Sequence, residues 1–199
     1  MGQIIGITGG IASGKSSVSQ YLKELGFTIV DADVASRAVV EPGEEAYLQV
    51  VKAFGEDLLL SDGNIDRAKL GSIIFHDQEK RLLLNSIVHP AVRNWMRVET
   101  EKALATGAET VFMDIPLLFE SKLTFMVEKT LLIYVDESVQ LERLMNRNTL
   151  TKPDALARIR SQMPLKDKKA LADAVVDNNG DIEETKKQVD EVLKKWNIL

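Results

Sequence analysis

Residues 9–16 read GGIASGKS, which matches the pattern GxxxxGKS in full. The apolar run at residues 4–7 precedes this stretch, and a helical pattern follows from residue 17. A buried strand, a glycine-rich turn and a helix in this order bring backbone N–H groups and the positive end of a helix dipole together, which favours phosphate binding. The stretch therefore predicts an α/β fold with a nucleoside triphosphate site.

Each residue type in this stretch has a separate use. Gly9 and Gly14 stand where a side chain would obstruct the phosphates, and the Lys15 ammonium can reach the β and γ oxygens. The Ser16 hydroxyl can ligate Mg²⁺. We therefore expect the nucleotide to bind together with its magnesium ion.

Length and composition favour one compact globule. The chain has 199 residues, 45% of them hydrophobic, which is enough to bury a sizeable core. No stretch reaches the ~18 apolar residues of a membrane span. Because cysteine is absent, any metal must bind through oxygen or nitrogen. We expect a cytoplasmic protein that is a monomer or a weak homo-oligomer.

Charge is distributed unevenly along the chain. The formal net charge of −5 argues against a nucleic-acid partner, because such binding depends on basic surface. Between residues 140 and 170, in contrast, basic residues outnumber acidic ones: Arg143, Arg147, Lys152, Arg158, Arg160, Lys166, Lys168 and Lys169. This segment is either a solvated helical face or lies near an anionic ligand.

Five short apolar runs predict the strands of a parallel sheet. They cover residues 3–7, 28–30, 110–113, 130–135 and 174–176, and are continuous, as in strands buried on both faces. Asp31, Asp114, Asp136 and Asp177 follow four of these strands. Ligands of open α/β sheets lie beyond the carboxyl ends of the strands, so these carboxylates are expected near the phosphate site. An aspartate there is also a common helix cap, and Asp136 fits that use.

Two insertions interrupt this predicted core. The interval between the second and third strands is too long for one crossover helix and has turn signals at residues 42–43 and 61–64. Its helical pattern over 78–104 is expected to be interrupted at Pro90. The basic segment contains Pro153 and Pro164, which predict short helices that resemble a lid.

These features divide one phosphate-binding chain, residues 1–199, into three parts. The core comprises residues 1–31, 107–139 and 173–199, and its amphipathic helix over 181–196 is expected to pack on the sheet. Residues 32–106 form the helical insertion. Residues 140–172 form the lid.

Residues 31–33 supply two candidates for a catalytic base. Transfer of a γ-phosphoryl group to an alcohol needs a carboxylate near the hydroxyl to accept its proton. Asp31 and Asp33 both follow the second strand, and the alternation of side chains along a strand points them different ways. Spacing alone leaves the choice between them open.

Other candidates have competing interpretations. Arg143 and Arg147 are four residues apart on a predicted helix and could clamp phosphates, or could pair with surface acids such as Glu142. Asp114 could complete a magnesium site or only cap a turn. His89 is more typical of a packing or hydrogen-bonding residue than of a catalyst.

Further motifs occur in a fixed order along the chain. They are DAD at residues 31–33 followed by ASR at 35–37, HP at 89–90, PLLFE at 116–120, QLERLMNR at 140–147 and VDNNG at 176–180. Together with TGGIASGKS at residues 8–16, this set resembles the dephospho-coenzyme A kinase family over almost the whole chain. The phosphate-binding stretch alone indicates only a nucleotide, whereas the ordered set is specific to this family.

The resemblance implies a P-loop kinase fold, with a five-stranded parallel sheet of order 2-3-1-4-5 flanked by helices. It also implies that the insertion over residues 32–106 helps to bind the acceptor. It implies transfer of the γ-phosphoryl group of ATP to the ribose 3′-hydroxyl of dephospho-coenzyme A, with Mg²⁺, as the last step of coenzyme A biosynthesis. The implied catalytic residues are Asp33 as the base, with Lys15 and Arg143 stabilising the transferred group.

The resemblance also implies the binding residues. Those for ATP are Gly10, Ile11, Ala12, Ser13, Gly14, Lys15, Ser16, Ser17, Arg147 and Asn178, of which Asn178 would approach the adenine. Those for the acceptor are Thr8, Asp33, Arg37, His89, Leu118, Phe119 and Glu120. For the metal the resemblance implies Ser16. Asp114 is added as a second candidate ligand from its position at a strand end, directly or through water.

Two positions depart from the family pattern. Ala12 replaces a glycine common in the family, which is tolerable if its backbone angles are ordinary, and Asp114 stands where some members have an apolar residue. A nucleoside or nucleotide monophosphate kinase shares the core and lid and is the alternative function. A nucleotide-dependent switch is disfavoured, because residues 134–137 read YVDE instead of the NKxD base-recognition motif.

Overall fold

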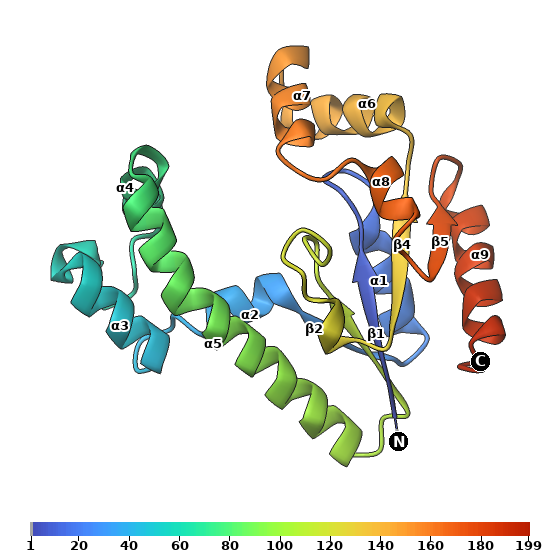
Figure 1. The fold of residues 1–199 in the computed structure, drawn as a ribbon, viewed down its shortest axis with the longest axis horizontal. Coiled ribbons are helices and arrows are strands. Elements are labelled where there is room, and N and C mark those ends of the chain that lie inside the picture. Colours follow the sequence, from blue (N-terminus) through green and yellow to red (C-terminus); the bar gives the residue numbers. More distant parts are fainter. Residues whose placement is uncertain (1) are drawn as a thin grey trace. The chain divides into compact units, whose positions relative to one another are not determined.

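The computed structural model describes residues 2–199 and divides them into two units (Figure 1). The first unit contains residues 2–30 and 102–199, and the second contains residues 31–101. The first is a sheet flanked by helices, whereas the second is almost entirely helical.

The first unit is built on a five-stranded sheet of order β2-β3-β1-β4-β5. Its strands are β1 (Gln3–Thr8), β2 (Thr28–Asp31), β3 (Thr110–Asp114), β4 (Lys129–Tyr134) and β5 (Ala174–Asp177). β1 pairs in parallel with β3 and β4, and β4 pairs in parallel with β5. The five predicted strands and the strand order 2-3-1-4-5 are therefore confirmed.

Helices cover both faces of the central strands. α1 (Lys15–Glu24) and α9 (Ile182–Lys195) pack on one face, as Figure 1 shows for α9 beside β5. Their Leu22 and Leu193 belong to a core cluster with Ile7 and Ile133 of the strands. α8 (Leu165–Lys169) covers the other face of β4, where Leu165 joins Leu132. Because both faces are buried, the strands are continuous apolar runs.

The segment between β3 and β4 packs directly on β1. A Cβ built at Gly6 would lie 3.0 Å from Leu118 Cδ2 and 3.2 Å from the methyl groups of Val127. The segment contains η2 (Thr124–Met126), and Leu118 within it is fully buried. Glycine at position 6 therefore lets residues 116–127 lie against the sheet.

The basic segment forms short helices, as its prolines predict. α6 (Glu137–Asn148) ends at Thr149, which has φ +51°, and α7 (Lys152–Arg160) begins with Pro153 in its first turn. The two helices share a core of Leu144, Ala155 and Ile159, onto which Ile11 and Ala12 also pack.

The second unit has a small core of its own. It contains α2 (Ala32–Ala38), α3 (Glu45–Phe54), η1 (Glu56–Leu58), α4 (Arg67–His76) and most of α5 (Gln78–Ala105). Val50, Leu58 and Ile65 form the centre of the core. Residues 61–64 form a turn, in which Gly63 has φ +85°.

The expected interruption at Pro90 is wrong, because α5 runs through it as one helix. Proline removes one backbone N–H from the helix, at a cost of about 3 kcal/mol. Leu84, Ile87 and Val88 of the same helix pack against the core of the second unit. Burial of these side chains offsets the lost hydrogen bond.

Among residues 2–199, none of the helices combines the length and the apolar content needed to cross a membrane.

The packing of α9 predicts a large effect of truncating Leu193. Leu193→Ala is expected to lower the free energy of unfolding by about 3 kcal/mol, because a fully buried leucine leaves a cavity. Leu171→Ala is the matched control: its side chain is 55% exposed, and the change should cost less than about 1 kcal/mol. Urea denaturation followed by circular dichroism measures both, and equal losses would contradict the packing of α9.

Candidate active site

The phosphate loop, residues 9–14, joins β1 to α1. Gly14 is the N-cap residue of α1 and has φ +86°, and within residues 2–199 no side chain caps this helix. Ser16 and Ser17 are exposed in its first turn. The N–H groups that begin α1 are therefore open to an anion, as the sequence predicts for a phosphate.

Three side-chain amides form hydrogen bonds with backbone groups of the phosphate loop. Gln162 Oε1 accepts from the Ile11 N–H at 2.8 Å, and Gln140 Nε2 donates to the Ile11 carbonyl at 2.7 Å. Asn178 Nδ2 donates to the Ser13 carbonyl at 2.8 Å. These bonds fix backbone groups that belong to no helix or strand ladder.

Asn178 is expected to approach the ATP adenine, but in the structure both ends of its amide are used inside the protein. Its Nδ2 bonds the loop, and its Oδ1 accepts from Thr185 Oγ1 of α9 at 2.7 Å. The residue is buried. Asn178 thus links the phosphate loop to α9, and its contact with adenine stays a prediction.

The glycines of the loop are needed for this packing. A Cβ at Gly10 would lie 2.8 Å from Gln140 Nε2, and a Cβ at Gly14 would clash with the Asn178 amide. At Gly9 a Cβ would lie 2.5 Å from Ser13 Oγ. Side chains at these positions would therefore displace the bracing amides and Ser13, in addition to any obstruction of the phosphates.

Ala12 lies in the left-handed region with φ +58°. Alanine in place of the family's glycine was expected to be tolerable if the backbone angles were ordinary, and at Ala12 they are not. For an L-residue this conformation costs roughly 1–2 kcal/mol, because Cβ crowds the neighbouring carbonyl oxygen. The loop keeps this strain because its neighbours are held on both sides.

Lys15 and Asp114 form an ion pair at the end of β3. Lys15 Nζ contacts Asp114 Oδ1, and Ser19 Oγ donates to Asp114 Oδ2 at 2.6 Å. Asp114 is buried, with 3% of its surface exposed. Both carboxylate oxygens thus have partners, and the Lys15 ammonium is held beside the phosphate loop.

Within residues 2–199 no three histidine, cysteine, aspartate or glutamate side chains gather as a metal site. Magnesium in nucleotide sites is held by one or two protein oxygens together with phosphates and water. The exposed Ser16 hydroxyl and the Asp114 carboxylate supply oxygen donors of the kind that suits this ion. Because the Asp114 oxygens already have protein partners, an interaction through water fits its surroundings better than direct ligation.

Thr8, Leu118 and Phe119, expected at the acceptor site, are buried in the first unit. The Thr8 hydroxyl donates to the Pro116 carbonyl at 3.0 Å. Leu118 packs against β1 at Gly6. The contacts of Thr8 and Leu118 join the turn that follows β3 to β1.

Glu120 differs from these residues because part of its carboxylate is unused. Its Oε1 accepts from the Met163 N–H at 3.1 Å and from Lys168 Nζ at 2.8 Å. Its Oε2 is buried and has no hydrogen-bond partner among residues 2–199. Glu120 therefore has one acceptor atom available for a further donor.

Arg143 lies beside the phosphate loop on α6. Its NH1 atom is 3.9 Å from the position that a Cβ on Gly14 would occupy. Arg147, one turn later, donates from Nε to Asn148 Oδ1 at 2.9 Å. Neither arginine forms an ion pair with a carboxylate of residues 2–199. The surface ion pairs considered as the alternative are thus not seen.

Asp136 stands at the N-cap position of α6 but does not cap it with its side chain. Its Oδ1 accepts from the Tyr134 hydroxyl at 2.8 Å. This hydrogen bond, together with burial, raises the pKa of Tyr134 above its ordinary value. The expectation of a helix cap is therefore correct for the position and wrong for the hydrogen bond.

In the second unit, the carboxylates of Asp31 and Asp33 differ in their hydrogen bonds. Asp31 Oδ1 accepts from the N–H groups of Asp33 and Val34, at 2.7 and 3.3 Å, and so caps α2. The Asp33 side chain is exposed, and within residues 31–101 its carboxylate has no hydrogen-bond partner. Asp31 is thus occupied by a structural contact, whereas the Asp33 carboxylate has no partner within its own unit.

Arg37 and His89 are the remaining acceptor candidates, and both are exposed. Arg37 Nε donates to the backbone carbonyl of Asp33 at 3.2 Å, one turn earlier on α2. His89 lies next to Pro90 on α5.

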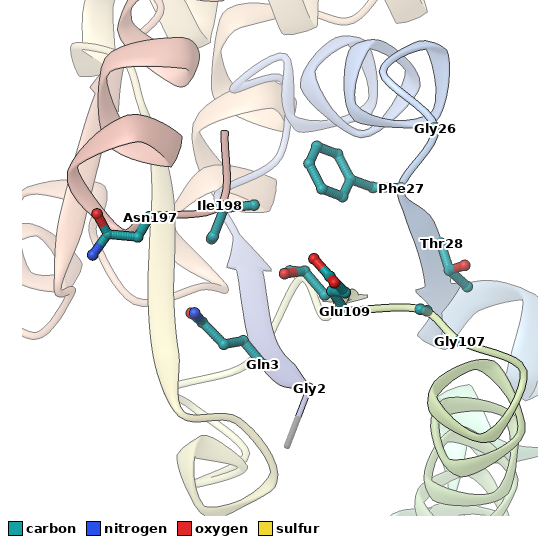
Figure 2. Close-up of a pocket in the computed structure, with 11 residues that line it drawn as sticks. Gly2, Gln3, Gly26, Phe27, Thr28, Gly107, Glu109, Asn197 and Ile198 are labelled. Carbon is teal, nitrogen blue, oxygen red and sulfur yellow. The ribbon is translucent and has the colours of Figure 1, made fainter.

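A cavity of about 600 Å³ lies at the opposite, amino-terminal edge of the sheet (Figure 2). Figure 2 shows Gln3, Thr28 and Glu109 around it, at the beginning of strands or just before them. It contains none of the predicted site residues. The phosphate loop and Asp114 lie instead at the carboxyl ends of β1 and β3, where ligands of open α/β sheets bind.

No sequence motif pointed to a function for Gln162 and Thr185, and Lys168 was predicted only as one of the basic residues that are either solvated or near an anionic ligand. Ile11 and Gln162 are 151 positions apart, so no local pattern connects them. Lys168 is fully buried, which corrects its place among the solvated or ligand-facing cations.

Comparisons with known proteins identify relatives over the full chain. The family model described as dephospho-CoA kinase matches residues 3–184. The dephospho-CoA kinase of Oceanobacillus iheyensis is 56% identical over 98% of this chain and 98% of its own.

Solved structures agree with this finding. A crystal structure from Thermus thermophilus aligns with a TM-score of 0.78 at 34% identity, over 98% of this chain and 97% of its own. A dephospho-CoA kinase from Campylobacter jejuni aligns with a TM-score of 0.75 at 27% identity, over 98% of both chains.

The strained backbone at Ala12 predicts a stabilising substitution. Ala12→Gly is expected to raise the free energy of unfolding by up to about 1 kcal/mol, because glycine adopts positive φ without a Cβ clash. Ala157→Gly, in the exposed middle of α7, is the control and should lower stability by about 1 kcal/mol. Thermal and urea unfolding measure both variants. If Ala12→Gly also destabilises the protein, the strain is absent.

Proposed function

The chain belongs to the dephospho-CoA kinase family, and we propose that its residues transfer the γ-phosphoryl group of ATP to the ribose 3′-hydroxyl of dephospho-CoA. The protein is a kinase of coenzyme A biosynthesis, with relatives of that name at 52–56% identity over the full chain. A nucleoside or nucleotide monophosphate kinase is not favoured. The proposal rests on one observation. Side-chain hydrogen bonds hold the phosphate loop, and the loop leads into α1, whose first N–H groups have no side-chain cap.

Lys15 exchanges one anionic partner for another when ATP binds. In the structure its ammonium is paired with Asp114, and in the proposed complex it contacts the β and γ oxygens. The ammonium therefore has an anionic partner before and after binding, which limits the cost of desolvating it. Arg143, beside Gly14, adds a second positive charge that stabilises the transferred group.

Magnesium would be held by the Ser16 hydroxyl and, through water, by Asp114, together with the phosphates of ATP. When bound, the ion would neutralise part of the phosphate charge. Ser19 keeps the Asp114 carboxylate oriented by its 2.6 Å hydrogen bond.

Asp33 is the proposed base. The acceptor 3′-oxygen forms a bond to the γ-phosphorus, the bond from that phosphorus to the β–γ bridging oxygen breaks, and the hydroxyl proton passes to the Asp33 carboxylate. Support comes from the capping of α2 by Asp31, which leaves Asp33 without a structural partner in its own unit. ADP and coenzyme A are the products.

The remaining predicted residues complete the two binding sites. Arg37, His89 and Glu120 would contact the acceptor, and Arg147 would contact ATP. Residues 140–172 would close over both substrates and exclude water, which competes with the acceptor hydroxyl. The lack of cysteine is compatible with a cytoplasmic location, and the negative net charge argues against a nucleic-acid partner. A monomer or weak homo-oligomer stays a prediction.

A panel of acceptors tests the function. Purified protein with ATP and Mg²⁺ should release ADP with dephospho-CoA and form coenzyme A, and should show no comparable rate with adenosine or nucleoside monophosphates. Chelation of Mg²⁺ should abolish turnover, and restoring the ion should recover it. ADP release with a nucleoside monophosphate instead of dephospho-CoA would favour the alternative kinase.

Replacing the proposed base separates catalysis from nucleotide binding. Asp33→Asn should lower kcat roughly a hundredfold or more, because the proton acceptor is lost, while ATP affinity stays near wild type. Asp31→Asn serves as the comparison and should retain most of the turnover, since an asparagine oxygen can still cap α2. A large loss of kcat in Asp31→Asn with normal turnover in Asp33→Asn would exchange the two assignments.

A further inference from the structure

Lys168 is a buried, charged side chain that contacts the phosphate loop. It belongs to α8 and has no exposed surface. Its Nζ donates to the Gly9 carbonyl at 2.8 Å and to the Pro116 carbonyl at 3.3 Å, and pairs with Glu120 Oε1 at 2.8 Å. A lysine ammonium has three donors, so these partners use them all and leave none for a ligand.

The three partners of Lys168 belong to two functional segments. Gly9 begins the phosphate loop, whereas Pro116 and Glu120 belong to the turn that follows β3. The Pro116 carbonyl also accepts from Thr8 Oγ1, so the end of β1 joins the same cluster. One side chain thus sets the position of the phosphate loop relative to this turn.

Stability alone does not account for a lysine at this position. Taking an ammonium out of water costs several kcal/mol, and a complete set of partners only offsets that cost. An apolar side chain of similar length would fill the same space without it. The charge is therefore explained better by the geometry that it imposes on Gly9 and Glu120.

We propose that Lys168 is a positioning residue of the kinase, acting on ATP through the Gly9 carbonyl and on the acceptor through Glu120. The inference rests on the proposed function. Lys168 holds Glu120 Oε1, so the carboxylate is oriented with its unpartnered Oε2 as the atom that can accept a hydrogen bond from the acceptor. Without Lys168, the Gly9 carbonyl and Glu120 lose their common donor, and the two segments are free to shift.

Removing the ammonium tests this position kinetically. K168M should lower kcat/KM for ATP and for dephospho-CoA about tenfold or more, because hydrogen bonds to a charged donor are lost. K194M makes the same chemical change at an exposed lysine of α9 and should keep wild-type kinetics. A folded K168M enzyme with wild-type kcat and KM for both substrates overturns the proposal.

K168M alone leaves the Glu120 carboxylate without its cation. Testing K168M in an E120Q background separates this effect from the loss of positioning. With the carboxylate gone, E120Q/K168M is expected to melt within a few degrees of E120Q, yet to bind ATP about tenfold more weakly in an equilibrium titration. Equal ATP affinity of the two folded variants overturns the role of Lys168 at Gly9. If the wild-type chain itself binds no ATP, the proposed function fails instead, so the two failures are distinguishable.

Discussion

A loop that binds phosphate with its own backbone must keep some of its N–H groups for the phosphate, and so is not held by the hydrogen-bond ladders of strands and helices. In this protein buried side chains supply the missing support. Gln140, Gln162 and Asn178 bond backbone groups of residues 11–13, and Lys168 bonds the carbonyl of Gly9. The conformation of the loop therefore depends on the segments that carry these side chains.

These supports explain how the rest of the first unit is arranged. Gln140 lies on α6, Lys168 on α8, and Asn178 just after β5 with a hydrogen bond to Thr185 of α9. Gln140 and Lys168 thus bond the loop directly from their helices, whereas α9 contacts it only through Asn178. Rigidity has a local cost, because Ala12 is held at a positive φ that glycine would adopt without strain.

The charges of the site are also placed before any substrate binds. Lys15 is held by Asp114, and Asp114 is held by Ser19. In the second unit Asp31 is used as the cap of α2, while the neighbouring Asp33 has no partner within that unit. Two carboxylates that are alike in the sequence are thus separated by their hydrogen bonds, because only one of them lies where the helix needs a cap.

The sequence by itself determined the sheet, the phosphate loop and the candidate residues. Apolar runs, glycines and aspartates at strand ends are local patterns, because each follows from the geometry of a few neighbouring residues. Even so, the effect of Pro90 was predicted wrongly, since packing along α5 outweighs the single lost hydrogen bond. Only the tertiary structure decided which side chains hold the loop, and that Lys168 is buried. Ile11 and Gln162, or Gly9 and Lys168, are more than a hundred positions apart, and a glutamine or lysine has no local signal for a partner at that distance.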